Sequence, residues 1–156
     1  MQKNTCCFIG HRTINETEEL KKQLYKTVET LIAVKRVNTF LFGSKSRFND
    51  LCYEVVSGLK QRYPNIKRVY VRAEYPVIGE EYENYLSEFY EETFFPQKII
   101  KAGRAIYNER NSIMIDSSES CVFYFDNQNA PPKSGTKAAF NYAKKRNKEI
   151  INLFSL

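Results

Sequence analysis

The sequence predicts an α/β protein in three layers, with a mostly parallel central sheet of five or six strands and helices on both faces. Two features predict this fold. Short apolar runs alternate with longer segments in which apolar residues recur at helical spacing, as expected when crossover helices cover a parallel sheet. Polar turns that contain glycine also follow or lie beyond several of these runs, which is typical of the carboxyl edge of such a sheet.

The short apolar runs mark the expected strands. They lie near residues 4–9, 38–42, 67–72, 121–125 and 149–153. A shorter sixth strand is expected near residues 92–95. The first and fourth runs are apolar almost throughout, which indicates strands buried on both faces.

The segments between the strands have helical period. Helices are expected near residues 16–34, 46–63, 79–91, 104–117 and 136–146. In the first of them, Leu20, Leu24, Val28 and Leu31 form one apolar stripe that would face the sheet.

Length and composition restrict the remaining possibilities. The 156 residues fit a single domain over residues 1–156, and a hydrophobic fraction of 42% excludes a disordered chain. The four cysteines have neither disulfide nor zinc-site spacing. No stretch approaches the ~20 apolar residues of a membrane span, so we expect a cytoplasmic protein. The net charge of +6 suits nucleic acid or a phosphorylated small molecule.

Polar residues at the predicted edge of the sheet are the candidates for ligand binding. Exposed amides and helix N-termini at such an edge bind phosphate groups, and arginine binds phosphate or carboxylate with two hydrogen bonds. The candidates in the three turns are Gly10, His11, Arg12, Gly43, Ser44, Lys45, Ser134, Gly135 and Thr136. The alternative is structural: the turns cap helices, Arg12 caps carbonyls and His11 makes a local hydrogen bond. As the single histidine, His11 also excludes a two-histidine metal site, and we expect neither a metal nor a cofactor.

Two further pairs are candidates. Arg110 and Asn111 are polar residues within an otherwise amphipathic helix, and we expect Arg110 to reach the same edge. Asp50 and Glu54 lie one turn apart near the start of the second helix. They are the catalytic candidates, because a carboxyl group with a raised pKa in a dry pocket assists cleavage of an N-glycosidic bond. Their structural alternative is stabilisation of the helix N-terminus by Asp50 and a solvated Glu54.

Four segments carry a resemblance to a known family. They are residues 6–12 (CCFIGHR), residues 42–44 (FGS) with Phe48 and Glu54, residues 107–116 (YNERNSIMID) and residues 134–145 (SGTKAAFNYAKK). In this order they resemble the YpsA-type branch of the SLOG superfamily, which takes its name from Smf/DprA and the LOG phosphoribohydrolases. The resemblance implies a Rossmann-like fold, glycine turns that bind nucleotides or nucleotide-derived molecules, and a homodimer or higher homo-oligomer.

The departures from the family patterns concern activity. The hydrolases carry PGGxGTxxE, whereas Ala138 and Ala139 stand here where those enzymes place acids. The turn that often reads GGALGFD in YpsA-like sequences is GSKSRFN at residues 43–49. Lysine and arginine thus replace small residues, and Asn49 replaces an acid.

Three functions remain open on this basis. The first is binding of a nucleotide or a phosphoribosyl or ADP-ribose-like molecule by a sensor or sequestering protein. The second is a nucleoside-monophosphate N-glycosidase that uses Glu54 or Asp50. The third is DNA binding through the basic last helix, although no zinc finger, RNP motif or helix-turn-helix pattern accompanies its charge.

Overall fold

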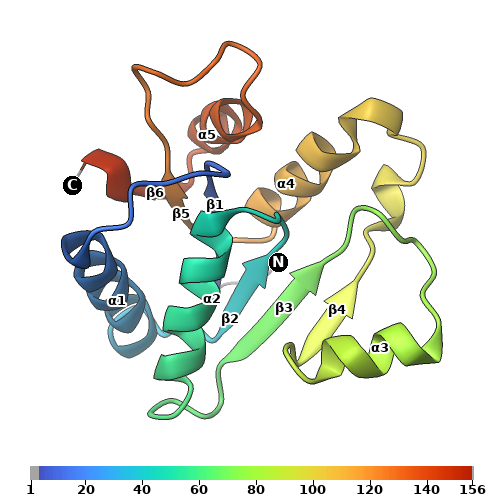
Figure 1. The fold of residues 1–156 in the computed structure, drawn as a ribbon, viewed down its shortest axis with the longest axis horizontal. Helices are drawn as coiled ribbons and strands as arrows, with labels where there is room; N and C mark the ends of the chain where they lie inside the picture. The colour runs from blue at the N-terminus through green and yellow to red at the C-terminus, as the bar shows by residue number, and fades with distance from the viewer. Residues whose placement is uncertain (1–3, 156) are drawn as a thin grey trace.

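The computed structural model describes residues 4–155, in which six parallel strands form one sheet (Figure 1). The strands are β1 (Thr5–Gly10), β2 (Thr39–Phe42), β3 (Lys67–Val71), β4 (Glu92–Phe94), β5 (Ser120–Tyr124) and β6 (Glu149–Asn152). The predicted α/β class is therefore confirmed, with the sixth strand included. The prediction of a single domain over residues 1–156 stays a prediction, and residues 1–3 and 156 lie outside the described part.

The order of the strands determines where a ligand crevice forms. The order across the sheet is β4-β3-β2-β1-β5-β6. β1 thus pairs with β2 on one side and with β5 on the other, with Gly10 beside Tyr124. The chain first builds the sheet outward from β1 and then returns to its other side. In open α/β sheets such a reversal opens a crevice at the carboxyl ends of the strands.

Helices cover both faces of the sheet, which confirms the three layers. α1 (Glu18–Ala33) and α2 (Arg47–Leu59) pack on one face, whereas α4 (Ile106–Asp116) and α5 (Gly135–Lys145) pack on the other. The short α3 (Glu80–Ser87) lies beside β3 and β4 (Figure 1). Three 3-10 turns complete the described part of the chain: η1 (Gln97–Ile99), η2 (Gly103–Ala105) and η3 (Leu153–Ser155).

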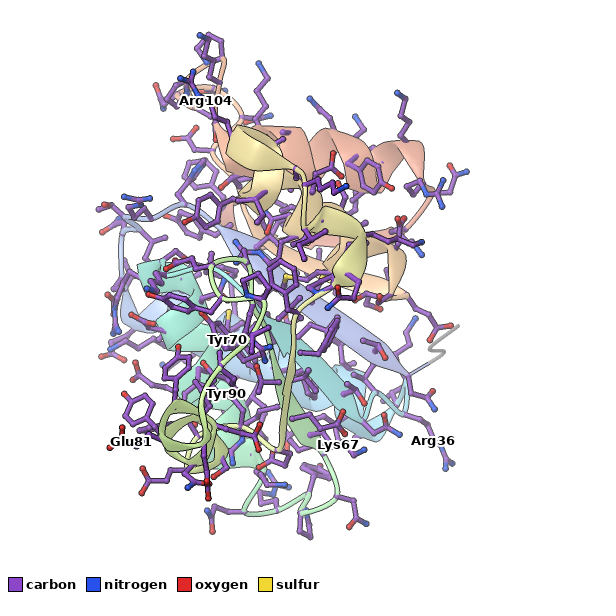
Figure 2. The ribbon with its side chains drawn as sticks, turned by 90° about the vertical axis from the view of Figure 1, so that its right-hand side faces the viewer. Arg36, Lys67, Tyr70, Glu81, Tyr90 and Arg104 are labelled. Atoms are coloured by element: carbon purple, nitrogen blue, oxygen red, sulfur yellow. The ribbon has the colours of Figure 1, made fainter. Side chains whose placement is uncertain are left out.

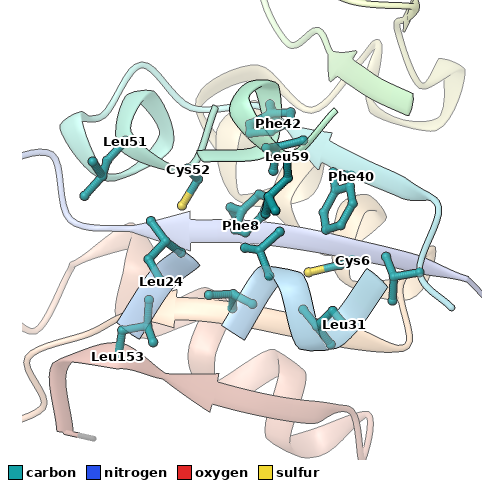
Figure 3. Packing of buried hydrophobic residues seen from close by; sticks show 14 of the residues in the cluster. Cys6, Phe8, Leu24, Leu31, Phe40, Phe42, Leu51, Cys52, Leu59 and Leu153 are labelled. Atoms are coloured by element: carbon teal, nitrogen blue, oxygen red, sulfur yellow. The ribbon is translucent and has the colours of Figure 1, made fainter. Parts of the chain in front are cut away.

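Alternate residues of the central strand separate two apolar cores. Cys6 and Phe8 of β1 face α1 and α2 (Figure 3), and Cys7 and Ile9 face α4 and α5. This follows from the two-residue period of a strand. All four cysteines are buried free thiols.

Two predicted helix ends differ from the structure. The third helix ends at Ser87 instead of residue 91, because the chain turns there to place Tyr90 on Tyr70 and to pair the Glu91 amide with the Arg68 carbonyl. The second helix ends at Leu59 instead of residue 63. Tertiary contacts override helical period at the end of the third helix. No helix within residues 4–155 has the length and apolar character that crossing a membrane requires.

Candidate functional site

One cavity lies at the carboxyl edge of the sheet, where β1 and β2 end and where α2 and α5 begin. Its volume is about 510 Å³. We call it the edge cavity, and it contains every residue that the sequence proposed for ligand binding. These are Gly10, His11, Arg12, Gly43, Ser44, Lys45, Arg110, Asn111, Ser134, Gly135 and Thr136. The structure therefore brings the three turns and α4 together, and binding of a ligand by these residues stays a prediction.

Arg110 is the most deeply buried cation of the edge cavity, with 4% of its surface exposed. Its guanidinium donates one hydrogen bond to the Gly43 carbonyl and another, 3.1 Å long, to Asn111 Oδ1. The same group lies 5.7 Å from the centre of the Tyr107 ring. Within residues 4–155 no carboxylate forms an ion pair with it. Burial lowers the pKa of Arg110, since desolvation opposes the charged form.

Gly43 serves the site through its missing side chain. A Cβ atom at this position would lie 2.7 Å from Met114 Sδ and 2.8 Å from Arg110 Cδ. Its amide donates to Asn49 Oδ1 at 3.3 Å, and its carbonyl accepts from Arg110. The Gly43 amide therefore already has an acceptor within the protein, so it is not free to bind a phosphate.

Asn49 supports the edge cavity without lining it, and the sequence did not reveal this role. It is buried on α2, and its Nδ2 donates to the Phe8 carbonyl at 3.1 Å while its Oδ1 accepts from Gly43. One side chain thus ties the ends of β1 and β2 together. The side-chain amide has both the donor and the acceptor that this bridge needs, so Asn49 has a structural role.

Gly10 also has a structural reason to be glycine. A Cβ atom there would overlap the ring of Phe48, in the first turn of α2. The close approach of α2 to β1 therefore requires glycine, whatever the cavity binds.

His11 and Arg12 play different parts. His11 Nε2 accepts a hydrogen bond of 2.9 Å from the Asp126 amide, and burial lowers the pKa of His11. The neutral imidazole thus holds the start of the loop before α5, as the structural alternative expected. Arg12 is exposed at the rim, and its carbonyl accepts from the Arg47 amide at 2.9 Å. Its guanidinium has neither an ion pair nor a hydrogen bond to the described residues.

The N-terminus of α5 presents backbone donors to the edge cavity. Ser134 caps the helix by accepting from the Lys137 amide at 3.2 Å. The amides of Gly135 and Thr136 belong to the first turn, where the helix itself supplies no acceptor. They are placed as an anion site requires. The N-terminus of α2 has fewer free backbone donors. Its Arg47 amide donates to the Arg12 carbonyl, and its Asn49 amide donates to the Ser46 hydroxyl.

An ion pair spans the mouth of the edge cavity. Lys45 Nζ lies 3.5 Å from Glu74 Oε1, and the attraction of Glu74 raises the pKa of Lys45. Glu74 follows β3 in the chain and was missing from the predicted site. Its position just beyond a strand of the same sheet was the signal for it.

Asp50 and Glu54 lie outside the edge cavity. They line a neighbouring groove between α2 and α3. Both are exposed, and Glu54 Oε2 accepts from Arg47 Nη1 at 3.1 Å. Phe48, Leu51 and Cys52 turn toward the sheet, so the two carboxylates project sideways. The expected dry pocket around them is not formed, and their catalytic role lacks its geometric support.

Comparisons with known proteins agree with this architecture. The DNA processing protein A of Helicobacter pylori, which has a unique single-stranded DNA binding mode, matches with a TM-score of 0.55 at 18% sequence identity. The match covers 96% of this chain and 64% of that one, so this chain spans under two-thirds of its length. No curated protein matches the sequence. The sequence model of the YspA SLOG family matches residues 8–155, and the chain belongs to that family.

Proposed function

We propose that the edge cavity binds a nucleotide or a nucleotide-derived molecule, such as a phosphoribosyl or ADP-ribose-like compound, in a sensor or sequestering protein. The observation that carries this proposal is Arg110, a buried guanidinium with no carboxylate partner among the described residues. A buried charge without a partner is costly. A bound phosphate would supply the missing anion.

The rest of the lining supports the same ligand. The cavity holds the cations Arg12, Lys45 and Arg110 against the single carboxylate Glu74. The first-turn amides of α5 add donors and the positive end of a helix dipole. A phosphate held by Arg110 and these amides would have charge-assisted hydrogen bonds, which are stronger than neutral ones.

Thermal unfolding with a ligand panel tests the proposal. The panel contains nucleoside mono- and diphosphates, cyclic dinucleotides and ADP-ribose. A ligand at a hundredfold excess over its Kd should stabilise the protein by about 2.7 kcal/mol. Arg12→Ala should reduce this stabilisation while leaving the free protein as stable as before, because Arg12 is exposed. Lys26→Ala, an exposed cation on α1, is the control. No shift with any member of the panel would refute the proposal.

Single-stranded DNA is the alternative ligand, since the structural neighbour binds it and the edge cavity is cationic. The two ligands differ in how binding responds to salt. If the protein contacts several phosphates of the DNA, the affinity should fall steeply as salt rises, whereas the affinity for a mononucleotide should fall little.

The N-glycosidase alternative is tested by chromatography for free base after incubation with nucleoside monophosphates. Release that survives Glu54→Gln and Asp50→Asn would exclude these residues as its catalysts.

A further inference from the structure

A second cavity, of about 550 Å³, lies between α2 and α3. Half of its lining residues are aromatic, and we call it the tyrosine groove. The residues that define it are Phe42, Tyr53, Tyr70, Tyr82, Tyr85 and Tyr90. Figure 2 shows Tyr70 and Tyr90 close together near α3.

The inner wall of the tyrosine groove is a fixed aromatic surface. The rings of Tyr70 and Tyr90 stack at 5.2 Å, and the Tyr53 ring meets Tyr90 edge to face at 5.3 Å. The Tyr53 hydroxyl donates to the Phe89 carbonyl at 2.6 Å. Burial raises the pKa of Tyr70 and of Tyr90, so both remain uncharged phenols. The wall is therefore neutral and already ordered.

The outer wall comes from α3, which commits little of itself to the core. Leu86 is its one buried residue among those described. Tyr82 and Tyr85 stack at 6.1 Å with ring planes 13° apart, and Tyr85 is 54% exposed. Exposed aromatic surface beside a cavity is a feature of ligand-binding sites.

The tyrosine groove and the edge cavity adjoin each other. Ser44 and Lys45 line both of them. Phe42 in the groove directly precedes Gly43 in the cavity, and the charges of Lys45 and Arg110 act on Tyr70. A ligand held at Arg110 can therefore extend into the groove past Ser44 and Lys45.

The two cavities differ in charge. The edge cavity has three cationic side chains against one carboxylate. The groove has Lys45 and Arg47 against Asp50 and Glu54, so its charged side chains balance. An anionic group is thus favoured in the edge cavity, and a neutral planar group is favoured between the tyrosines.

We propose that the tyrosine groove binds the nucleobase of a ligand whose phosphate occupies the edge cavity. This inference rests on the proposed function and narrows it, because it selects nucleotides over sugar phosphates without a base. Any of the bases can stack on an aromatic ring, and the loss of one such contact weakens binding by roughly tenfold or more.

Isothermal titration with nested ligands tests the inference. The probes are ribose 5-phosphate and the 5′-monophosphates of adenosine, guanosine, cytidine and uridine. At least one nucleotide should bind more tightly than ribose 5-phosphate. Tyr82→Ala should weaken that nucleotide by roughly tenfold and leave ribose 5-phosphate unchanged, whereas Arg12→Ala should weaken both.

Two variants serve as controls. Tyr82→Phe keeps the ring and should keep the affinity. Tyr25→Ala removes a partly exposed tyrosine on α1, far in sequence from the groove, and should change nothing.

The outcomes separate the two proposals. If ribose 5-phosphate and the nucleotides bind equally and Tyr82→Ala has no effect, the base subsite is wrong while phosphate binding stands. If Tyr82→Ala changes the molar mass measured by light scattering and leaves nucleotide affinity intact, the groove is a contact between copies of the chain. If none of these probes binds, the base subsite is wrong, and if no member of the thermal-unfolding panel binds either, the proposed function fails as well.

Discussion

The guanidinium of Arg110 donates a hydrogen bond to the backbone carbonyl of Gly43, which joins α4 to the end of β2 beneath the edge cavity. This contact is possible because residue 43 has no side chain. A Cβ atom would enter the space that Met114 Sδ and Arg110 Cδ occupy. The buried cation of the site is thus positioned by a glycine that belongs to another element.

Gly43→Ala should therefore displace Arg110. We expect a loss of about 1–3 kcal/mol in the free energy of unfolding, as for other overpacked positions, and a weaker thermal shift from phosphorylated ligands. Urea unfolding measures the first effect. Gly58→Ala is the matched control, because a Cβ there meets nothing within 4 Å. Gly58 lies inside α2, so alanine should stabilise the protein by about 0.5–1 kcal/mol. Equal stability of the two variants would contradict the steric argument.

Asn49→Asp tests the bridge between β1 and β2. The carboxylate can accept from the Gly43 amide but cannot donate to the Phe8 carbonyl. We expect a destabilisation of about 1–3 kcal/mol at neutral pH, measured by urea unfolding. Protonation of the introduced carboxyl group restores a donor, so the destabilisation should become smaller as the pH falls. Asn65→Asp, at an exposed turn, should have little effect. A loss that grows in acid would exclude this explanation.

The sequence predicted the strands, the layers and the residues that meet at the edge of the sheet, because each depends on local period or on a strand end. It could not distinguish why those residues are there. Gly10 faces Phe48, Gly43 faces Arg110, and Asn49 bridges two strands. These are contacts between segments far apart in the chain, and no local pattern encodes them.

The same limit explains the misplaced carboxylates. Their spacing correctly put Asp50 and Glu54 on one side of α2, but the rotation of the helix about its axis decides which cavity that side faces. The rotation is fixed by Phe48, Leu51 and Cys52 in the core. The aromatic residues of the tyrosine groove were hidden for a related reason, since Tyr53, Tyr70 and Tyr90 come from three separate segments.

His11 should make the free energy of unfolding depend on pH, together with the hydrogen bond that holds the loop before α5. Burial lowers its pKa below the ordinary value of 6.5, so the folded protein binds the proton more weakly than the unfolded chain does. The contribution of His11 to the free energy of unfolding is fully present above pH 6.5. This contribution is lost as the pH falls from 6.5 toward the pKa of His11 in the folded protein. Protonation also removes the acceptor for the Asp126 amide. As His11 is the single histidine, its proton NMR titration gives the pKa directly. A value above 6.5 would be incompatible with this account.

Glu74→Gln should strengthen the binding of phosphorylated ligands. The change removes the one carboxylate from the edge cavity and releases Lys45 from its ion pair. Because Lys45 is 74% exposed, salt screens the effect. We therefore expect a gain of a few-fold in affinity at low salt that diminishes at high salt, measured by isothermal titration. Glu119→Gln changes the net charge equally, at an exposed position outside the cavity lining, and should not reproduce the gain. If both variants gain equally, net charge and not the pair at the mouth governs the affinity.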